Sequence, residues 1–243
     1  MARGLRLKGP VPNAPALNMK RDQRNQRGRP GQQAWALVAV GLALLSMVFF
    51  VSGAATADWA WHAEQPLRAL NWWTAALVHH GPWHLAANVG AAAAVAAWGW
   101  VARLQTRHAL AWLAAWPLSQ ALLITDPGSL SDYAGLSATL HAGVAIGCWS
   151  LMRDRVGGAR FVGGAVFSAV LIKLMLEAPS VQAWWTGLSV QALPSVALPG
   201  APGHVLAGHA HLCGVAAGLI AAAVADGLSR SARHLQVDRA EPS

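Results

Sequence analysis

Ser137 opens an apolar stretch of the chain, and His141 follows it by four residues. On a helix this spacing places a hydroxyl and an imidazole on one face. A serine becomes a nucleophile when an adjacent base accepts its proton, so these residue types suit covalent catalysis. Gly135 and Ala138 beside the serine leave room for a second backbone. Taken alone, the pattern also fits a helix contact made by small residues, with an incidental hydroxyl.

The composition indicates a membrane protein. Of the 243 residues, 55% are hydrophobic and 12% are charged, whereas soluble domains carry roughly 25% charged residues. The apolar residues form blocks too long for barrel strands, so we expect helices that cross a bilayer. We predict one all-α bundle of six membrane-spanning helices, at 34–52, 82–101, 109–124, 135–152, 161–177 and 204–226.

These blocks define a membrane domain over residues 34–228. It lies between a basic tail over 1–33, expected to be disordered and cytoplasmic, and a second cytoplasmic tail over 229–243. Met19 is an alternative start. Ala55-Thr56-Ala57 resembles a signal-peptidase site, but the preceding run of 19 residues exceeds the roughly 7–15 of a signal segment. We therefore expect a retained first helix, followed by a structured surface loop over 53–78.

The net charge of +8 is better explained by membrane topology than by nucleic-acid binding. If the amino terminus is inside, every Lys and Arg except Arg68 and Lys173 falls in an inside segment. The positive-inside rule then places both termini in the cytoplasm. Lys173 lies near the outer end of its span, where a long side chain can reach the interface. The acids of the outside segments are Asp58, Glu64, Asp126, Asp132 and Glu177.

Cysteines and tryptophans are interpreted as structural. Cys148 and Cys213 lie in apolar runs without CxxC spacing, which favours packing over a disulfide or a metal pair. Many of the 13 tryptophans fall near block ends, which is typical of an interfacial aromatic belt. These are Trp35, Trp59, Trp61, Trp72, Trp73, Trp184 and Trp185.

Three of the predicted spans carry polar residues at the same depth, near the outer surface. Ionisable residues inside a bilayer are costly and by default mark a functional site. They are His79, His80, His84 and Asn88 at the second span, Ser137 at the fourth, and His209 and His211 at the sixth.

Gly214 and Gly218 lie one turn apart, a spacing that lets two membrane helices approach closely. We expect the sixth span to press against the fourth through these glycines. That contact would bring His211 to Ser137, where a neutral imidazole can accept the serine proton. His209 lies about 200° round the helix from His211 and is the alternative base.

Three motifs together resemble the signature of rhomboid intramembrane serine proteases: His79-xxxx-His84-xxx-Asn88, Gly135-x-Ser137 and Ala210-His211-xx-Gly214-xxx-Gly218. The resemblance covers the six-helix core and implies a bacterial inner-membrane endopeptidase whose site faces the periplasm. It implies that Ser137 attacks the scissile carbonyl and that His211 carries the proton, with neither cofactor nor metal. Because the nearest acids lie in loops, we expect a dyad without a third acid.

The resemblance also implies supporting roles. The backbone N–H of Ser137 and the side chains of His84 and Asn88 would hold the oxyanion. His79 would steady the second span. His141 would orient His211.

Departures from the usual rhomboid pattern point to one branch of the family. Ala138 stands where rhomboids usually have glycine, and His141 where they usually have a tyrosine stacked on the catalytic histidine. The Gly-Leu-Ser-x-x-Leu-His-x-Gly form resembles rhombosortases, which are implied to cleave carboxy-terminal Gly-Gly membrane anchors from exported proteins. The usual Trp-Arg before the second span reads Leu70-Asn71.

Two alternative functions stay open at this point. His80 and His84, four residues apart, could bind a metal ion together with His209 and His211, as in a metal-binding or transport protein. Against this, the chain has no HExxH motif. The second alternative is a non-catalytic binder of membrane helices that keeps the rhomboid shape.

Overall fold

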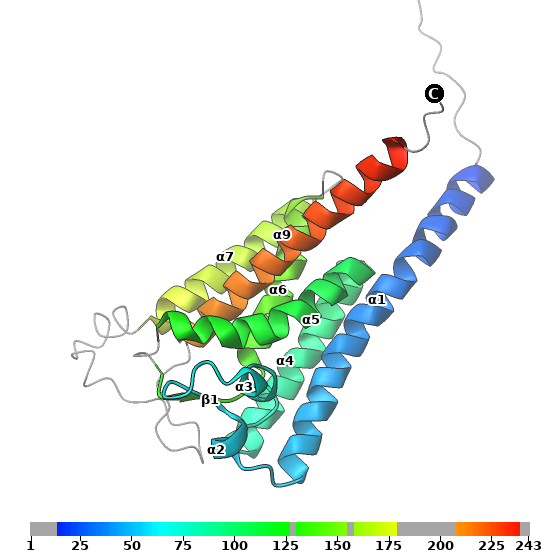
Figure 1. The fold of residues 1–243 in the computed structure, drawn as a ribbon. Coiled ribbons are helices and arrows are strands. Elements are labelled where there is room, and N and C mark those ends of the chain that lie inside the picture. The colour runs from blue at the N-terminus through cyan, green and yellow to red at the C-terminus, as the bar shows by residue number, and fades with distance from the viewer. Residues whose placement is uncertain (1–13, 127–129, 155–157, 179–207, 239–243) are drawn as a thin grey trace, which may run out of the picture.

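The computed structural model describes residues 14–126, 130–154, 158–178 and 208–238. Helices dominate it (Figure 1). The long ones are α1 (Ala14–Val51), α4 (Pro82–Val101), α5 (Thr106–Ala121), α6 (Ser137–Met152), α7 (Ala159–Glu177) and α9 (Gly208–Asp238). The short elements are α2 (Thr56–Trp59), β1 (Trp61–His62), α3 (Ala69–Thr74), the 3-10 helix η1 (Leu122–Thr125) and β2 (Asp132–Tyr133).

Each predicted apolar block coincides with a helix, but the first tail differs from the prediction of disorder, and the helix of the last block continues into the second tail. Residues 14–33 belong to α1 and residues 229–238 to α9, so these parts are helical. The start of the first block is anchored at Gly31, where a Cβ would come 2.5 Å from the carbonyl oxygen of Leu104. Next to it, Gln32 Nε2 donates to the Trp100 carbonyl at 2.6 Å. Residues 1–13 and 239–243 lie outside the described residues.

Three of the described helices are long and apolar enough to cross a membrane: Arg29–Val51 within α1, the whole of α7, and Gly208–Ala232 within α9. Their length and hydropathy support association of the chain with a membrane. The helices α5 and α6 have 16 residues each and α4 has 20. Of the six predicted spans, three thus meet this test of length and hydropathy.

The long helices pack with their ends at two opposite poles of the molecule. The start of α1 and the end of α9 lie at one pole, and α2, β1 and α3 lie toward the other (Figure 1). At the first pole, Asp226 of α9 joins three helices. Its carboxylate lies 3.5 Å from Arg107 Nε and 3.1 Å from Arg153 Nε, and it accepts a bond from the Trp149 indole at 3.1 Å.

Tryptophans fill the core instead of marking only its borders. Trp35 and Trp61 are 0% exposed, so their assignment to an interfacial belt was wrong. Trp35 stacks on Trp112 with ring centroids 4.4 Å apart, and its indole donates to the Val95 carbonyl at 2.9 Å. A buried indole N–H needs such an acceptor. Trp184 and Trp185 lie outside the described residues.

The segment between α1 and α4 is structured, as predicted. Thr74 Oγ1 of α3 donates to the Trp59 carbonyl at 2.8 Å, and Asn71 Nδ2 donates to the Ala60 carbonyl. Strand β1 pairs antiparallel with β2, in a register that places Trp61 opposite Tyr133. This short sheet fixes the chain that leads into α6.

Candidate active site

Helices α6 and α9 meet backbone to backbone beside the two predicted catalytic residues. A Cβ on Gly214 would overlap the carbonyl oxygen of Ala138, and a Cβ on Gly218 would overlap that of Ala142. The predicted contact through these glycines is confirmed. Because no side chain separates the helices, residues at their facing ends lie within hydrogen-bond reach of each other.

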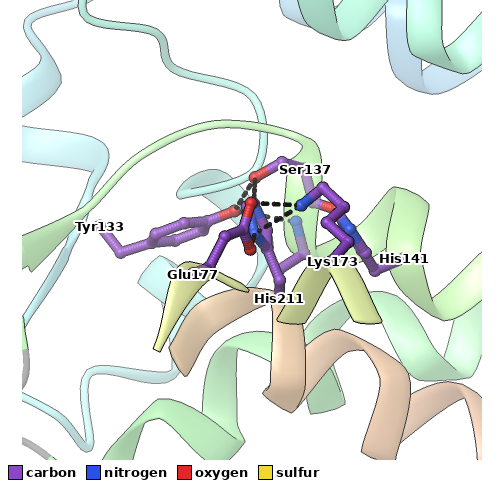
Figure 2. A network of polar contacts seen from close by, with 7 residues as sticks. Tyr133, Ser137, His141, Lys173, Glu177 and His211 are labelled. Atoms are coloured by element: carbon purple, nitrogen blue, oxygen red, sulfur yellow. Dashed lines mark hydrogen bonds and ion pairs between the residues drawn. The ribbon is translucent and has the colours of Figure 1, made fainter. Parts of the chain in front are cut away.

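The structure brings Ser137 and His211 together. Ser137 is the first residue of α6, and His211 lies in the first turn of α9. His211 Nε2 lies 3.0 Å from Ser137 Oγ, which is hydrogen-bond distance (Figure 2). Both side chains are partly buried. An imidazole at this place can take the hydroxyl proton.

A carboxylate completes the arrangement, contrary to the expectation of a dyad. Glu177, the last residue of α7, lies with Oε2 2.7 Å from His211 Nδ1. Both its own side chain and that of His211 are largely buried, with 16% and 13% exposed. Serine, histidine and glutamate therefore form one hydrogen-bonded chain (Figure 2).

Lys173 lies one turn before Glu177 and contacts both Glu177 and His211. Its Nζ lies 2.5 Å from Glu177 Oε1 and 3.3 Å from His211 Nδ1. The end of α7 fits against α9 because Gly208 has no side chain there: a Cβ would come 3.1 Å from both Cβ and the carbonyl oxygen of Glu177.

Tyr133 supports the nucleophile from the other side. Its hydroxyl lies 2.9 Å from Ser137 Oγ and accepts the backbone N–H of Ala138 at 2.9 Å. Burial raises the pKa of Tyr133 to about 12, so the phenol keeps its proton at neutral pH. With the N–H of Ala138 as donor, the phenol can give its own proton to Ser137 Oγ, and the serine O–H then points to His211.

His141 packs on the histidine that contacts Ser137. The rings of His141 and His211 stack with centroids 4.2 Å apart and an angle of 21° between their planes. His141 Nδ1 lies 2.7 Å from the carbonyl oxygen of Ser137. A side chain held at both points restricts how far the ring of His211 can turn.

His84 and Asn88 of α4 lie against Gly135, two residues before the serine. Gly135 has φ +125°, and a Cβ there would come 2.6 Å from His84 Cε1 and 3.6 Å from Asn88 Nδ2. Asn88 Nδ2 also donates to the His84 carbonyl at 3.1 Å. The glycine thus lets two polar side chains approach the backbone that leads into Ser137.

His79 is buried behind these groups. Its Nδ1 lies 3.3 Å from the Leu77 carbonyl oxygen, and its ring meets that of His84 edge-on, with centroids 5.0 Å apart. Burial, together with the charge of His84, lowers the pKa of His79 to about 3. A neutral ring here serves packing at the start of α4.

The alternative assignments receive less support from the geometry. His209 Nε2 contacts Cys213 Sγ at 3.4 Å, whereas His211 is the histidine that reaches Ser137. Among the described residues, no group of three or more His, Cys, Asp or Glu side chains is placed to hold a metal ion. Cys148 and Cys213 are free and buried.

Comparison with known proteins adds no relative: no family model, curated protein or solved structure matches this chain.

Sequence reasoning missed two members of this cluster. Charge counting assigns Glu177 to an outside segment, although its i, i+4 spacing from Lys173 at the outer end of a span is a usable signal. Tyr133 is the only tyrosine in the chain and precedes Ser137 by four residues. Its role depends on the pairing of β1 with β2, which the sequence pattern did not indicate.

Proposed function

We propose that this protein is an intramembrane serine endopeptidase of the rhomboid type. It has six membrane-spanning helices with both termini in the cytoplasm of a bacterial cell, and its site opens toward the periplasm. The observation that carries the proposal is the 3.0 Å contact between Ser137 Oγ and His211 Nε2. These two residues are 74 positions apart in the chain, yet their side chains meet at the starts of α6 and α9.

The proton transfers of the reaction need only Ser137, His211 and a water molecule. Ser137 Oγ attacks the scissile carbonyl carbon while its proton passes to His211 Nε2. The tetrahedral intermediate collapses, the C–N bond breaks, and His211 protonates the leaving amine. Water then attacks the acyl-enzyme ester as His211 accepts its proton, and the proton returns to Ser137 when the second product leaves.

The start of α6 is suited to hold the oxyanion. Ser137 is the first helical residue, so its N–H has no acceptor within the helix, and the positive end of the helix dipole points at the reacting carbonyl. His84 and Asn88 approach from α4 beside Gly135 and supply side-chain donors. Together these three donors stabilise the charge that develops in the transition state.

The substrate class follows from the resemblance to rhombosortases: exported proteins held by a carboxy-terminal transmembrane anchor that begins with Gly-Gly. A peptide carbonyl in a membrane helix is already hydrogen-bonded and closed to attack. Glycine loosens such a helix, since it costs about 1 kcal/mol relative to alanine. A partly exposed serine near the membrane surface then meets both an unwound strand and water.

The decisive experiment combines labelling with cleavage in proteoliposomes. A fluorophosphonate probe is expected to label wild type and Ser52→Ala, in which an exposed serine just after α1 is changed, but neither Ser137→Ala nor His211→Ala. Wild type and Ser52→Ala should also cleave a test substrate that ends in Gly-Gly, an apolar helix and a basic tail. A matched substrate with Leu-Leu in place of Gly-Gly should be cut more slowly.

Two outcomes would overturn the proposal. Labelling that persists in Ser137→Ala would move the nucleophile to another residue. A wild-type protein that binds anchored substrates but neither cleaves them nor reacts with the probe would instead be a binder of membrane helices.

A further inference from the structure

We infer that Glu177 is a positioning residue that selects the reactive tautomer of His211, in competition with Lys173. The inference rests on the proposed function, because it concerns the base that serves Ser137. It replaces the two-residue site expected from the sequence with a chain of Ser137, His211 and Glu177.

The tautomer matters because a neutral imidazole has one N–H and one bare nitrogen. His211 can accept the proton of Ser137 only if Nε2 is bare, and the ring proton must then sit on Nδ1. A proton on Nε2 would point at Ser137 Oγ and prevent general-base catalysis. Whatever faces Nδ1 therefore decides whether the serine is activated.

Two side chains face Nδ1 of His211, and they favour opposite protonation states of this nitrogen. The Glu177 carboxylate only accepts hydrogen bonds, so it requires Nδ1–H, and it lies 2.7 Å away. The Lys173 ammonium only donates, so it requires a bare Nδ1, and it lies 3.3 Å away. The shorter contact with a charged acceptor favours Nδ1–H. Lys173 is at the same time drawn to Glu177 Oε1 at 2.5 Å, which diverts its donors from the imidazole.

The surroundings hold Glu177 in this place. Glu177 is the last residue of α7. Because Gly208 has no side chain, the carboxyl-terminal end of α7 lies against the first turn of α9. Its side chain is 16% exposed, while that of Lys173 is 46% exposed. The acceptor is thus largely buried beside His211, whereas the side chain of the competing donor is exposed.

Nitrogen NMR of histidine-labelled protein in detergent micelles tests the tautomer without any substrate. The His211 signal is assigned by its loss in His211→Asn. At neutral pH the wild type is expected to carry its ring proton on Nδ1, and Glu177→Ala is expected to move it to Nε2. A wild type with the proton on Nε2, or a Glu177→Ala variant that keeps it on Nδ1, would overturn the inference even in an active enzyme.

Kinetics with the cleavable anchor substrate provide the second test. Glu177→Ala should lower kcat by about 10²–10⁴ with KM changed less than about threefold, because ground-state binding is untouched. Glu177→Asp should keep more of the activity. Adding Lys173→Met to Glu177→Ala should recover roughly tenfold, because it removes the competing donor. Glu64→Gln, an exposed acid in the surface segment, is the matched control and should behave as wild type.

The outcomes separate the two proposals. If Ser137→Ala is inactive while Glu177→Ala equals wild type, the protease assignment stands and the inference about Glu177 is wrong. If the double variant is no faster than Glu177→Ala, competition by Lys173 is wrong. If wild type never reacts at Ser137, the proposed function fails, and the NMR result still decides which nitrogen of His211 carries the proton and whether Glu177 determines this.

Discussion

Gly214 of α9 lies directly against the backbone carbonyl of Ala138 of α6, the residue that follows Ser137. Ala138 is itself fully buried, so the methyl group that distinguishes it from glycine is accommodated in the core. The close approach of base and nucleophile therefore depends on the glycine of α9, since only a residue without a side chain fits beneath this carbonyl.

Gly214→Ala is expected to separate the two helices. Its Cβ would overlap a backbone oxygen that cannot move without shifting α6, so the free energy of unfolding should fall by about 1–3 kcal/mol. Labelling of Ser137 should slow by at least about tenfold, because a displacement of one ångström breaks a hydrogen bond. Thermal unfolding in detergent and probe kinetics measure the two effects.

The control for this prediction is Gly90→Ala in α4, where an added Cβ meets no atom within 4 Å. Alanine favours helix over glycine, so this variant should keep its activity and its melting temperature or raise the latter. Equal behaviour of the two variants would contradict the role assigned to Gly214.

Tyr133→Phe tests the support of the nucleophile by the buried phenol. Loss of the hydroxyl leaves the Ala138 N–H without its acceptor, which should cost about 1–3 kcal/mol of unfolding free energy. The serine also loses its second partner at 2.9 Å, so labelling of Ser137 should slow while His211 keeps its contact. Chemical unfolding and probe kinetics measure these changes, and a variant unaltered in both would refute the assignment.

The helices and the pair Ser137–His211 were predictable because each leaves a local trace in the sequence. Apolar blocks fix the helices, and the spacing of Gly214 and Gly218 fixes which faces meet. Glu177, the third member of the hydrogen-bonded chain, has no comparable pattern in the sequence. Glu177 reaches His211 only through the docking of the end of α7 on the first turn of α9, and charge counting assigned it to a loop.

The predictions for Trp35 and for the tail over 1–33 were wrong for the same reason, because both depend on contacts between segments far apart in the chain. The position of Trp35 near a block end predicts an interfacial residue, but Gly99 opposite leaves a space that its indole fills. The tail over 1–33 was expected to be disordered from its composition. Contacts of Gln32 with the last turn of α4 and of Gly31 with the chain between α4 and α5 anchor its end instead, and residues 14–33 belong to α1.

His141→Ala should weaken the orientation of His211 without removing a reacting group. The stacked ring pair contributes about 0.5–1.5 kcal/mol beyond its buried area, so kcat should fall by roughly tenfold with little change in KM. His141→Phe keeps a stacking ring and loses only the contact with the Ser137 carbonyl, so it should retain more activity. Steady-state cleavage assays compare the two, and an equal loss in both would point to the hydrogen bond instead of the stack.

Acidification should destabilise the protein through His79, which lies in the segment before α4. Because burial and the charge of His84 lower its pKa from 6.5 to about 3, the unfolded chain binds a proton between these values that the folded chain does not. The free energy of unfolding is therefore fully retained above pH 6.5 and falls as the pH drops toward 3, by up to about 1.4 kcal/mol per pH unit. Thermal unfolding in detergent from pH 7.5 to 4.5 should show a steeper decline for wild type than for His79→Gln, which cannot take up this proton. Parallel declines in the two proteins would show that His79 is not the group responsible.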